Sequence, residues 1–212
     1  FTPNPEMLVA AHKDSYLREI LNKGDLNLCD GFGLALVSRC KRITGIDFML
    51  EICKIAEKER RGVYLLGSGS DKALLAAIHQ LKKNFPKLKI VGYDKGNELS
   101  IKNCELLVDR EQNNKIIKKI NNSNAYVLFI AFGHNKQEKW IYENLSKMPS
   151  VKIAMGVGGA FDYISGHVRR APCWMRKIGL EWMYRLHKQP KRAGRIFKAP
   201  IRFLWLVIKF KI

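Results

Sequence analysis

Acidic residues are scarce in this chain of 212 residues, which has 19 Asp and Glu against 38 Lys and Arg and a formal net charge of +19. A surplus of that size predicts an anionic partner, such as a nucleic acid, an anionic lipid or a phosphorylated substrate. The surplus is uneven, because residues 167–212 hold thirteen of the basic residues and a single acid, Glu181. Basicity is therefore concentrated at the C-terminal end.

Paired cysteines and long apolar runs are also missing. No apolar run approaches the roughly 20 residues that a membrane-spanning helix needs. The cysteines form no CxxC motif and lie at no ligand spacing from histidine, which favours reduced cytoplasmic thiols over a disulfide framework or a zinc site. The five cysteines are Cys29, Cys40, Cys53, Cys104 and Cys173.

Short apolar runs alternate with segments of helical periodicity. This alternation predicts an α/β fold with a Rossmann-like, mostly parallel sheet and helices on both faces. Residues 104–108 fit either a strand or a helix. The other expected strands are 63–66, 88–91, 126–132 and 151–155, and the expected helices are 47–60, 71–84, 114–120 and 137–145.

The two ends of the chain differ from this core. Asn4 and Pro5 suit the cap and first position of a helix, and helical spacing continues from there to Gly24. Residues 30–33 resemble a turn. After residue 170 basic and aromatic residues mix, so we expect a core over 1–170 and a basic amphipathic appendage over 171–212. That mixture is typical of a segment at a membrane interface, although packing of the aromatics on the core would also explain it.

Three glycine-bearing loops follow expected strands, at Gly67, Gly133 and Gly158. Ligands of open α/β sheets bind where loops leave the carboxyl ends of strands, and glycine lets backbone N–H groups approach a phosphate. Tight turns alone would explain the same glycines. Lys72 stands where a dinucleotide fingerprint needs its third glycine, so the cofactor signal is weak.

Several polar residues are candidates for chemistry. Asp30 lies in a glycine-rich turn and fits either a general base or a backbone cap. Lys136 and Gln137 follow the strongest expected strand, and side chains at such a position point toward a ligand crevice. Asp162 follows the last expected strand and has a similar position. Glu138 fits an acid at the start of a helix.

Basic residues near the C-terminus are candidates for binding phosphate. Arg185, Arg192 and Arg195 would share one face of a continuous helix and suit a diphosphate. A solvated basic helix is the alternative.

Together these motifs resemble the WecG/TagA/CpsF family of bacterial glycosyltransferases along nearly the whole chain. The segments that carry the resemblance are 2–6 (TPNPE), 30–31 (DG), 44–47 (TGID), 65–67 (LLG), 136–140 (KQEKW), 156–162 (GVGGAFD), 170–172 (RAP) and 179–186 (GLEWMYRL).

The resemblance implies an inverting transferase that needs no metal and no cofactor, and the chain has no Asp-x-Asp motif to hold a metal-bound nucleotide diphosphate. The donor would be a UDP-sugar, often N-acetylmannosamine or its uronic acid, and the acceptor N-acetylglucosamine on undecaprenyl diphosphate. The enzyme would be peripheral at the cytoplasmic face of the bacterial membrane, held at its anionic surface, and would contribute to cell-wall or capsule polymers. A homo-oligomer is left open.

Site residues follow from the matching motifs. Asp30 maps to the proposed base, and Thr2, Asn4 and Gln137 map to residues that orient sugar or acceptor. The appendage arginines map to those proposed to touch the diphosphate. We assign substrate binding to a set that combines Asn4 with residues of the strand-end loops: Gly67, Gly133, Lys136, Gly158 and Asp162.

Two features depart from the family pattern. Asn135 occupies a position where the family usually has proline, and residues 33–43 form a shorter stretch than usual. Two other classes stay open at this point: a nucleotide-cofactor oxidoreductase and a basic nucleic-acid-binding protein. The failed dinucleotide fingerprint counts against the first, and the absence of a recognised nucleic-acid-binding motif counts against the second.

Overall fold

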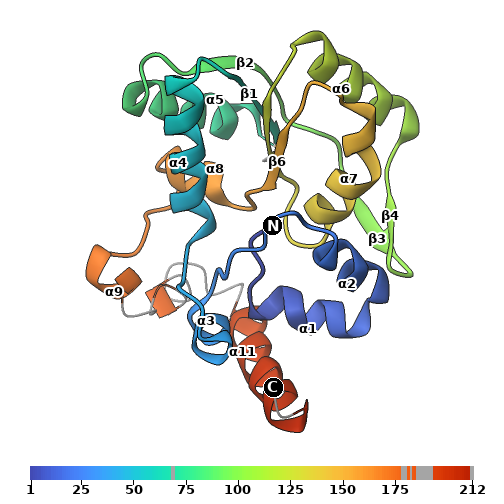
Figure 1. Ribbon diagram of the computed structural model, residues 1–212, viewed down its shortest axis with the longest axis vertical. Helices are drawn as coiled ribbons and strands as arrows, with labels where there is room; N and C mark the ends of the chain where they lie inside the picture. Colours follow the sequence, from blue (N-terminus) through green and yellow to red (C-terminus); the bar gives the residue numbers. More distant parts are fainter. Residues whose placement is uncertain (68–69, 178–180, 182, 185–192, 211–212) are drawn as a thin grey trace. The chain divides into compact units, whose positions relative to one another are not determined.

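The structure is a computed structural model that describes residues 1–67, 70–177, 181, 183–184 and 193–210. The chain forms two compact units, whose elements are labelled in Figure 1. Unit 1 consists of Phe1 and Gly45–Val168, and unit 2 consists of Thr2–Thr44 and Arg169–Ile212.

Unit 1 is built on a four-stranded parallel sheet with the strand order β2-β1-β5-β6. The central strands β1 and β5 are apolar and buried, as expected where both faces are covered. A separate antiparallel ribbon joins β3 and β4. The strands are β1 (Gly62–Gly67), β2 (Lys89–Asp94), β3 (Ser100–Lys102), β4 (Glu105–Leu107), β5 (Val127–Ala131) and β6 (Ile153–Gly156).

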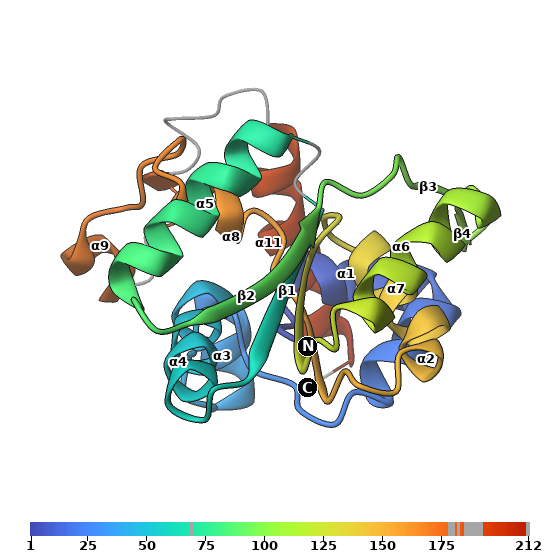
Figure 2. The same ribbon diagram turned by 90° about the horizontal axis from the view of Figure 1, so that it is seen from above.

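Helices cover both faces of this sheet (Figure 2). Alternate strand residues enter two apolar cores: Leu65 packs with α4, α5 and α8, whereas Leu66 packs with α6 and α7. The predicted α/β fold, with a mostly parallel sheet and helices around it, is therefore confirmed. The helices of unit 1 are α4 (Gly45–Lys58), α5 (Asp71–Asn84), α6 (Arg110–Asn122), α7 (Lys136–Asn144), the short 3-10 helix η1 (Leu145–Lys147) and α8 (Ala160–Ile164).

The order of the strands reverses between β1 and β5. The chain leaves β1 for β2 on one side of the sheet and later returns to place β5 on the other side of β1. In doubly wound sheets this switch point is where ligands bind, outside the carboxyl ends of the strands. The carboxyl ends of β1 and β5 therefore identify the edge at which a site is expected.

Unit 2 is helical, and its helix α11 packs on α1. Pro200 lies inside α11. Within the part of the chain that the structure describes, no helix is both long enough and apolar enough to cross a membrane. Among the residues that the structure describes, the helices of unit 2 include α1 (Pro5–Lys13), α2 (Ser15–Asn22), α3 (Phe32–Ser38), α9 (Cys173–Lys177) and α11 (Ala193–Phe210).

The single helix expected from Pro5 to Gly24 is wrong, because the chain breaks at Asp14. The Asp14 N–H still donates to the Ala10 carbonyl and ends α1, while its side chain accepts from the Leu17 N–H at 2.9 Å and begins α2. Aspartate favours a cap over a helix interior, so two helices replace one.

The turn expected over residues 30–33 also differs, since α3 already begins at Phe32. The grouping of the chain differs as well from the expected division at residue 170: a boundary does fall at 168/169, but residues 2–44 group with the C-terminal segment. The packing of α1 on α11 accounts for this.

Candidate active site

The carboxyl ends of three neighbouring strands form one row in unit 1. Gly67 of β1 is in register with Ala131 of β5, and Ile130 of β5 is in register with Gly156 of β6. A Cβ on Gly67 would lie 2.7 Å from the Ala131 carbonyl carbon, and φ at Gly67 is +104°. Only glycine therefore lets the two strand ends approach so closely at the switch point.

The loop after β5 turns sharply before it enters α7. Gly133 has φ +83°, and among the described residues other than its chain neighbours no atom lies within 4 Å of the position of a Cβ, so the space beside its backbone is open on this side. Asn135 also has a positive φ, +67°, which asparagine tolerates and proline cannot adopt. The departure from the family's usual proline thus coincides with a left-handed residue at the start of α7.

Gln137 joins this loop to the one after β6. Its Oε1 accepts from the Gly158 N–H at 3.0 Å, and its Nε2 donates to Glu138 Oε1 at 2.7 Å. Gly156 makes room for this side chain, because a Cβ there would lie 2.5 Å from Gln137 Nε2. Gln137 is buried, so its amide holds the glycine loop from inside unit 1.

Glu138 lies beneath this contact and is 1% exposed. Its Oε2 is buried and has no hydrogen-bond partner among the described residues. Burial raises the pKa of Glu138 from 4.5 to about 7, although hydrogen bonds from Gln137 and from nearby backbone lower it. The sequence suggested a helix-start acid here, but the position at the third residue of α7 gave no sign of complete burial.

A buried polar network anchors the rest of α7. Trp140 Nε1 donates to Asn113 Oδ1 at 2.7 Å, and Asn113 Nδ2 donates to Asn144 Oδ1 at 2.9 Å. Lys136, predicted to bind substrate, donates to the Leu99 carbonyl. The helix that carries Gln137 is therefore held on several sides.

Asp162 lies in the first turn of α8, directly after the Gly158 loop. Its backbone carbonyl accepts from the Val168 N–H at 3.1 Å and from the Ser165 hydroxyl at 3.0 Å. Unit 1 thus brings together six predicted site residues on the carboxyl-end loops: Gly67, Gly133, Lys136, Gln137, Gly158 and Asp162.

The remaining predicted residues of the described chain lie in unit 2. The Asp30 N–H donates to the Pro3 carbonyl at 2.9 Å, which places the aspartate beside the segment that holds Thr2 and Asn4. Asn4 caps α1 as predicted, because its Oδ1 accepts from the Met7 N–H at 3.0 Å. That oxygen is therefore engaged, and the amide Nδ2 is the part of Asn4 suited to a substrate.

Gly31 fixes the turn that carries Asp30. Its φ is +131°, and a Cβ there would lie 2.8 Å from Pro5 Cδ. The two motifs that hold Asp30 and Thr2 are thus packed on each other so closely that no side chain fits between them. The Asp30 side chain itself is half-buried.

Unit 2 also contains an ion-pair network that sequence reasoning missed. Glu181, the one acid in residues 167–212, pairs with Arg42 at 3.1 Å and with Arg170 at 3.7 Å. Arg42 also donates to the Arg176 carbonyl at 2.7 Å, and Arg170 to the Thr44 hydroxyl at 3.0 Å. A lone acid in a strongly basic segment was the signal that could have indicated a structural carboxylate.

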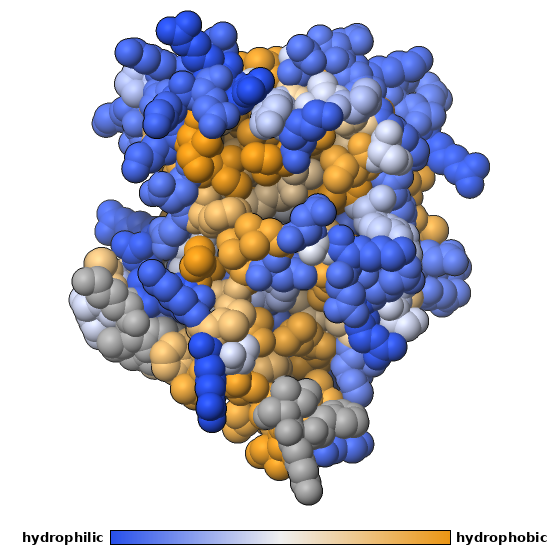
Figure 3. All heavy atoms as spheres, in the orientation of Figure 1, coloured by the Kyte–Doolittle hydropathy of each residue, from blue (hydrophilic) through white to orange (hydrophobic). Residues whose placement is uncertain are grey.

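Helix α11 exposes an apolar stripe (Figure 3). Ile201 and the apolar residues three, four and seven positions after it share one face of the helix and are more than half exposed. Phe203, on another face, is buried. Lys209 lies 4.7 Å from the ring centre of Trp205. The residues of this exposed stripe are Ile201, Leu204, Trp205 and Ile208.

Three arginines are predicted to bind the diphosphate. Arg185 and Arg192 lie outside the described residues, and Arg195 is placed only as part of the α11 backbone. Their role stays a prediction. Among the described residues, no three side chains of the types that bind metals gather at one place.

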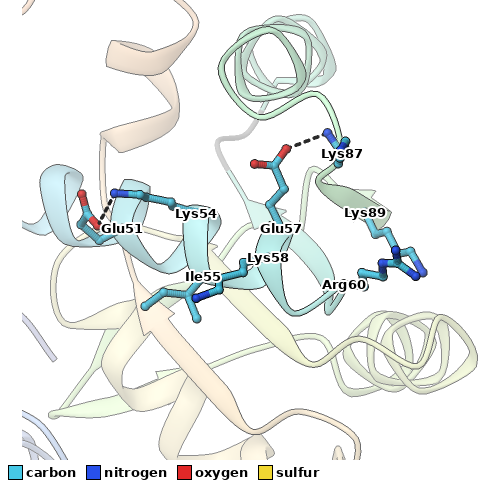
Figure 4. Close-up of a pocket in the computed structure, with 8 residues that line it drawn as sticks. All are labelled: Glu51, Lys54, Ile55, Glu57, Lys58, Arg60, Lys87 and Lys89. Carbon is cyan, nitrogen blue, oxygen red and sulfur yellow. Dashed lines mark hydrogen bonds and ion pairs between the residues drawn. The ribbon is translucent and has the colours of Figure 1, made fainter.

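A cavity of about 820 Å³ lies at the opposite edge of the sheet (Figure 4). Arg60 precedes β1, and Lys87 and Lys89 lie at the start of β2, so this cavity adjoins the amino ends of these strands. Its walls consist mainly of exposed charged side chains, including the Glu51–Lys54 ion pair. Ligands of parallel sheets bind at the other edge, so we do not assign the active site to it.

The fold is that of an α/β protein with a parallel sheet, a class in which ligands bind at the switch point. Residues 1–212 match the model of the glycosyl transferase WecG/TagA/CpsF family, so the chain belongs to this family and is a glycosyltransferase. The resemblance seen in the sequence is thereby confirmed, and the oxidoreductase and nucleic-acid-binding alternatives are not favoured.

Curated relatives are similar along nearly the whole chain. A protein of Bacillus subtilis strain 168 is 33% identical over 94% of this chain and 75% of its own length. One of Bacillus spizizenii is 30% identical over 98% and 77%, and one of Staphylococcus aureus strain MW2 is 29% identical over 99% and 79%. Each is named an N-acetylglucosaminyldiphosphoundecaprenol N-acetyl-beta-D-mannosaminyltransferase.

Proposed function

We propose that this enzyme transfers N-acetylmannosamine from a UDP-sugar to N-acetylglucosamine carried on undecaprenyl diphosphate. The acceptor and the transferred sugar are those in the names of its relatives, which match it over at least 94% of its length. The UDP donor follows from the family resemblance.

The observation that carries this proposal in the structure is the row of glycine loops at the switch point. Gly67 brings the ends of β1 and β5 together, and Gly133 leaves its backbone open to a ligand. Glycine at the ends of strands lets backbone N–H groups approach the oxygens of a diphosphate. These loops support a donor site at this edge of unit 1.

The reaction is a single displacement at the anomeric carbon. The acceptor hydroxyl attacks that carbon, its proton passes to the Asp30 carboxylate, and the bond from the anomeric carbon to the diphosphate oxygen breaks with inversion. Thr2, Asn4 and Gln137 orient the sugar or acceptor, Gln137 chiefly through the glycine loop that it holds. Positive charge from Arg185, Arg192 and Arg195 stabilises the departing UDP.

Access to the acceptor depends on the membrane surface. The exposed stripe of α11 inserts its apolar side chains at the boundary of headgroups and acyl chains, while Arg202 and Lys209 meet anionic headgroups. This arrangement makes the enzyme peripheral and brings it to its lipid-linked substrate.

Product analysis tests the proposal. The full chain is incubated with a panel of UDP-sugars and a short-chain lipid diphosphate that carries N-acetylglucosamine, and the product is identified by mass. With UDP-N-acetylmannosamine we expect a product that is heavier by one N-acetylhexosamine. With UDP-N-acetylglucosamine, supplied in a separate reaction because its product would have the same mass, we expect little product. The same acceptor with a monophosphate serves as control. Transfer of another sugar in preference would refute the donor, and equal use of the monophosphate would refute the acceptor.

A further inference from the structure

Two sequence motifs that lie apart in the chain meet in unit 1. Lys136-Gln137-Glu138 opens α7, and Gly156-Val157-Gly158-Gly159 follows β6. The pairing of β5 with β6 brings their ends together, and the Val157 N–H extends this pairing by donating to the Ile130 carbonyl at 2.8 Å. The Gln137 side chain of the first motif accepts a hydrogen bond from the Gly158 N–H of the second.

Gln137 can face the glycine loop in only one orientation. Its carbonyl oxygen must meet the Gly158 N–H, so its amide nitrogen must find an acceptor elsewhere. Glu138 Oε1 is that acceptor, at 2.7 Å. Without it the nitrogen would be buried and unpaired, and only the Gly158 N–H would hold the amide in this orientation.

We infer that Glu138 is a positioning residue, which fixes the Gln137 amide and through it the Gly158 loop at the carboxyl end of β6. Glu138 itself contacts no substrate, since it is buried beneath Gln137. The inference rests on the proposed function only where turnover is the readout.

Gly156 also contributes to the position of the Gln137 side chain. A Cβ at this position would lie within 3 Å of three atoms of the Gln137 side chain. The glycine is therefore required by Gln137 and not by its own backbone, whose φ is not positive. This makes the coupling of the two motifs testable by a double-mutant cycle.

The first experiment compares Glu138→Ala and Glu138→Gln in the full chain. Hydrogen exchange of the Gly158 amide, measured by NMR, reports on the loop independently of activity. We expect exchange about tenfold faster in Glu138→Ala, as the loss of one hydrogen bond allows, and near the original rate in Glu138→Gln, which keeps an acceptor oxygen. On the proposed substrates, kcat/KM should fall roughly tenfold to a hundredfold in Glu138→Ala and recover within a few-fold in Glu138→Gln.

Asn144→Ala is the matched control. It removes another buried polar side chain from α7, one that donates to the Trp140 carbonyl at 2.9 Å and lies in the Asn113 network. It should lower stability without changing Gly158 exchange or kcat/KM. An equal effect of Asn144→Ala on Gly158 exchange would mean that the loop responds to general loosening of α7 and would overturn the inference.

The second experiment is the cycle between Gly156→Ala and Gln137→Ala. Gly156→Ala should accelerate Gly158 exchange in the original chain and have little further effect once Gln137 is alanine. Independent, additive effects would overturn the coupling, as would a Glu138→Gln variant that behaves like Glu138→Ala. If no UDP-sugar is turned over by the unmodified chain, the proposed function fails while the exchange results still decide on Glu138.

Discussion

Replacing Glu138 by glutamine should change how the stability of unit 1 depends on pH. The folded protein holds the Glu138 proton up to about pH 7, whereas a carboxyl with the ordinary pKa of 4.5 loses it earlier. Between these values the folded state binds more protons than the unfolded state, so the free energy of unfolding falls as pH rises. Glutamine cannot titrate, and the variant lacks this loss.

The size of the effect follows from the shift. One pKa unit corresponds to about 1.4 kcal/mol, so a rise from 4.5 to about 7 is worth about 3 kcal/mol. Below pH 4.5 the two proteins should differ by a constant amount. From pH 4.5 to pH 8 the variant should gain about 3 kcal/mol relative to the original chain, with most of the gain complete by pH 7.

Urea unfolding at several pH values, followed by circular dichroism, measures this difference. Comparing two proteins that differ at one residue cancels the titration of every other group that the substitution leaves alone. Asn144→Ala again serves as control, because it removes a buried polar side chain of α7 that does not titrate and should give a constant difference across the range. A flat difference for Glu138→Gln, or one that declines with pH, would refute the reasoning.

Three further predictions concern activity and membrane binding. Asp30→Asn should lower kcat by roughly a hundredfold or more, as loss of a general base does, with UDP affinity by calorimetry nearly unchanged; activity within a few-fold of the original would remove Asp30 from this role. Turnover should persist in excess EDTA, because the chain has no Asp-x-Asp motif; loss of activity that Mg²⁺ or Mn²⁺ restores would contradict this. Replacing both Trp205 and Ile208 by serine should weaken binding to anionic vesicles, measured by sedimentation, at least about tenfold. Replacing Leu75, an exposed apolar residue of unit 1, by serine should leave vesicle binding unchanged. Arg192→Ala and Arg195→Ala should keep vesicle binding and lose turnover.

The sequence predicted the sheet well because parallel strands are nearly pure apolar runs. β1 and β5 each lie within about a residue of the expected segments, and α5 has the expected bounds, 71–84. These elements combine a strong hydrophobic pattern with clear breaks on both sides. Local pattern was sufficient where local pattern and tertiary packing agree.

The break at Asp14 shows where local pattern misleads. Apolar residues continue at helical spacing through Leu17, Ile20 and Leu21, and all three are buried in α2. Periodicity cannot distinguish one helix from two whose apolar faces continue each other. The deciding signal is a single side chain that prefers a cap.

The contacts inside the candidate site were beyond the sequence for a different reason. Following strands to their ends located Gly67, Gly133 and Gly158, because that rule depends only on chain order. The bond from Gly158 to Gln137 depends on which strands are neighbours, and β5 and β6 had first to be paired. Glu138 does lie at a helix start, but its burial beside Gln137 depends on the same pairing and could not be predicted from local pattern.

The packing within unit 2 connects the predicted base to α11, the helix that we propose meets the membrane. A Cβ on Gly33 would lie 3.7 Å from Pro5 and 3.9 Å from the ring of Phe203, so α3 lies in van der Waals reach of both. Pro5 also packs against Gly31, the neighbour of Asp30. Phe203 is buried on a face of α11 away from the exposed stripe. Interiors packed at this distance transmit small displacements instead of absorbing them. A shift of α11 on a lipid surface would therefore reach the turn that holds Asp30 through Phe203 and Pro5, within a single compact unit.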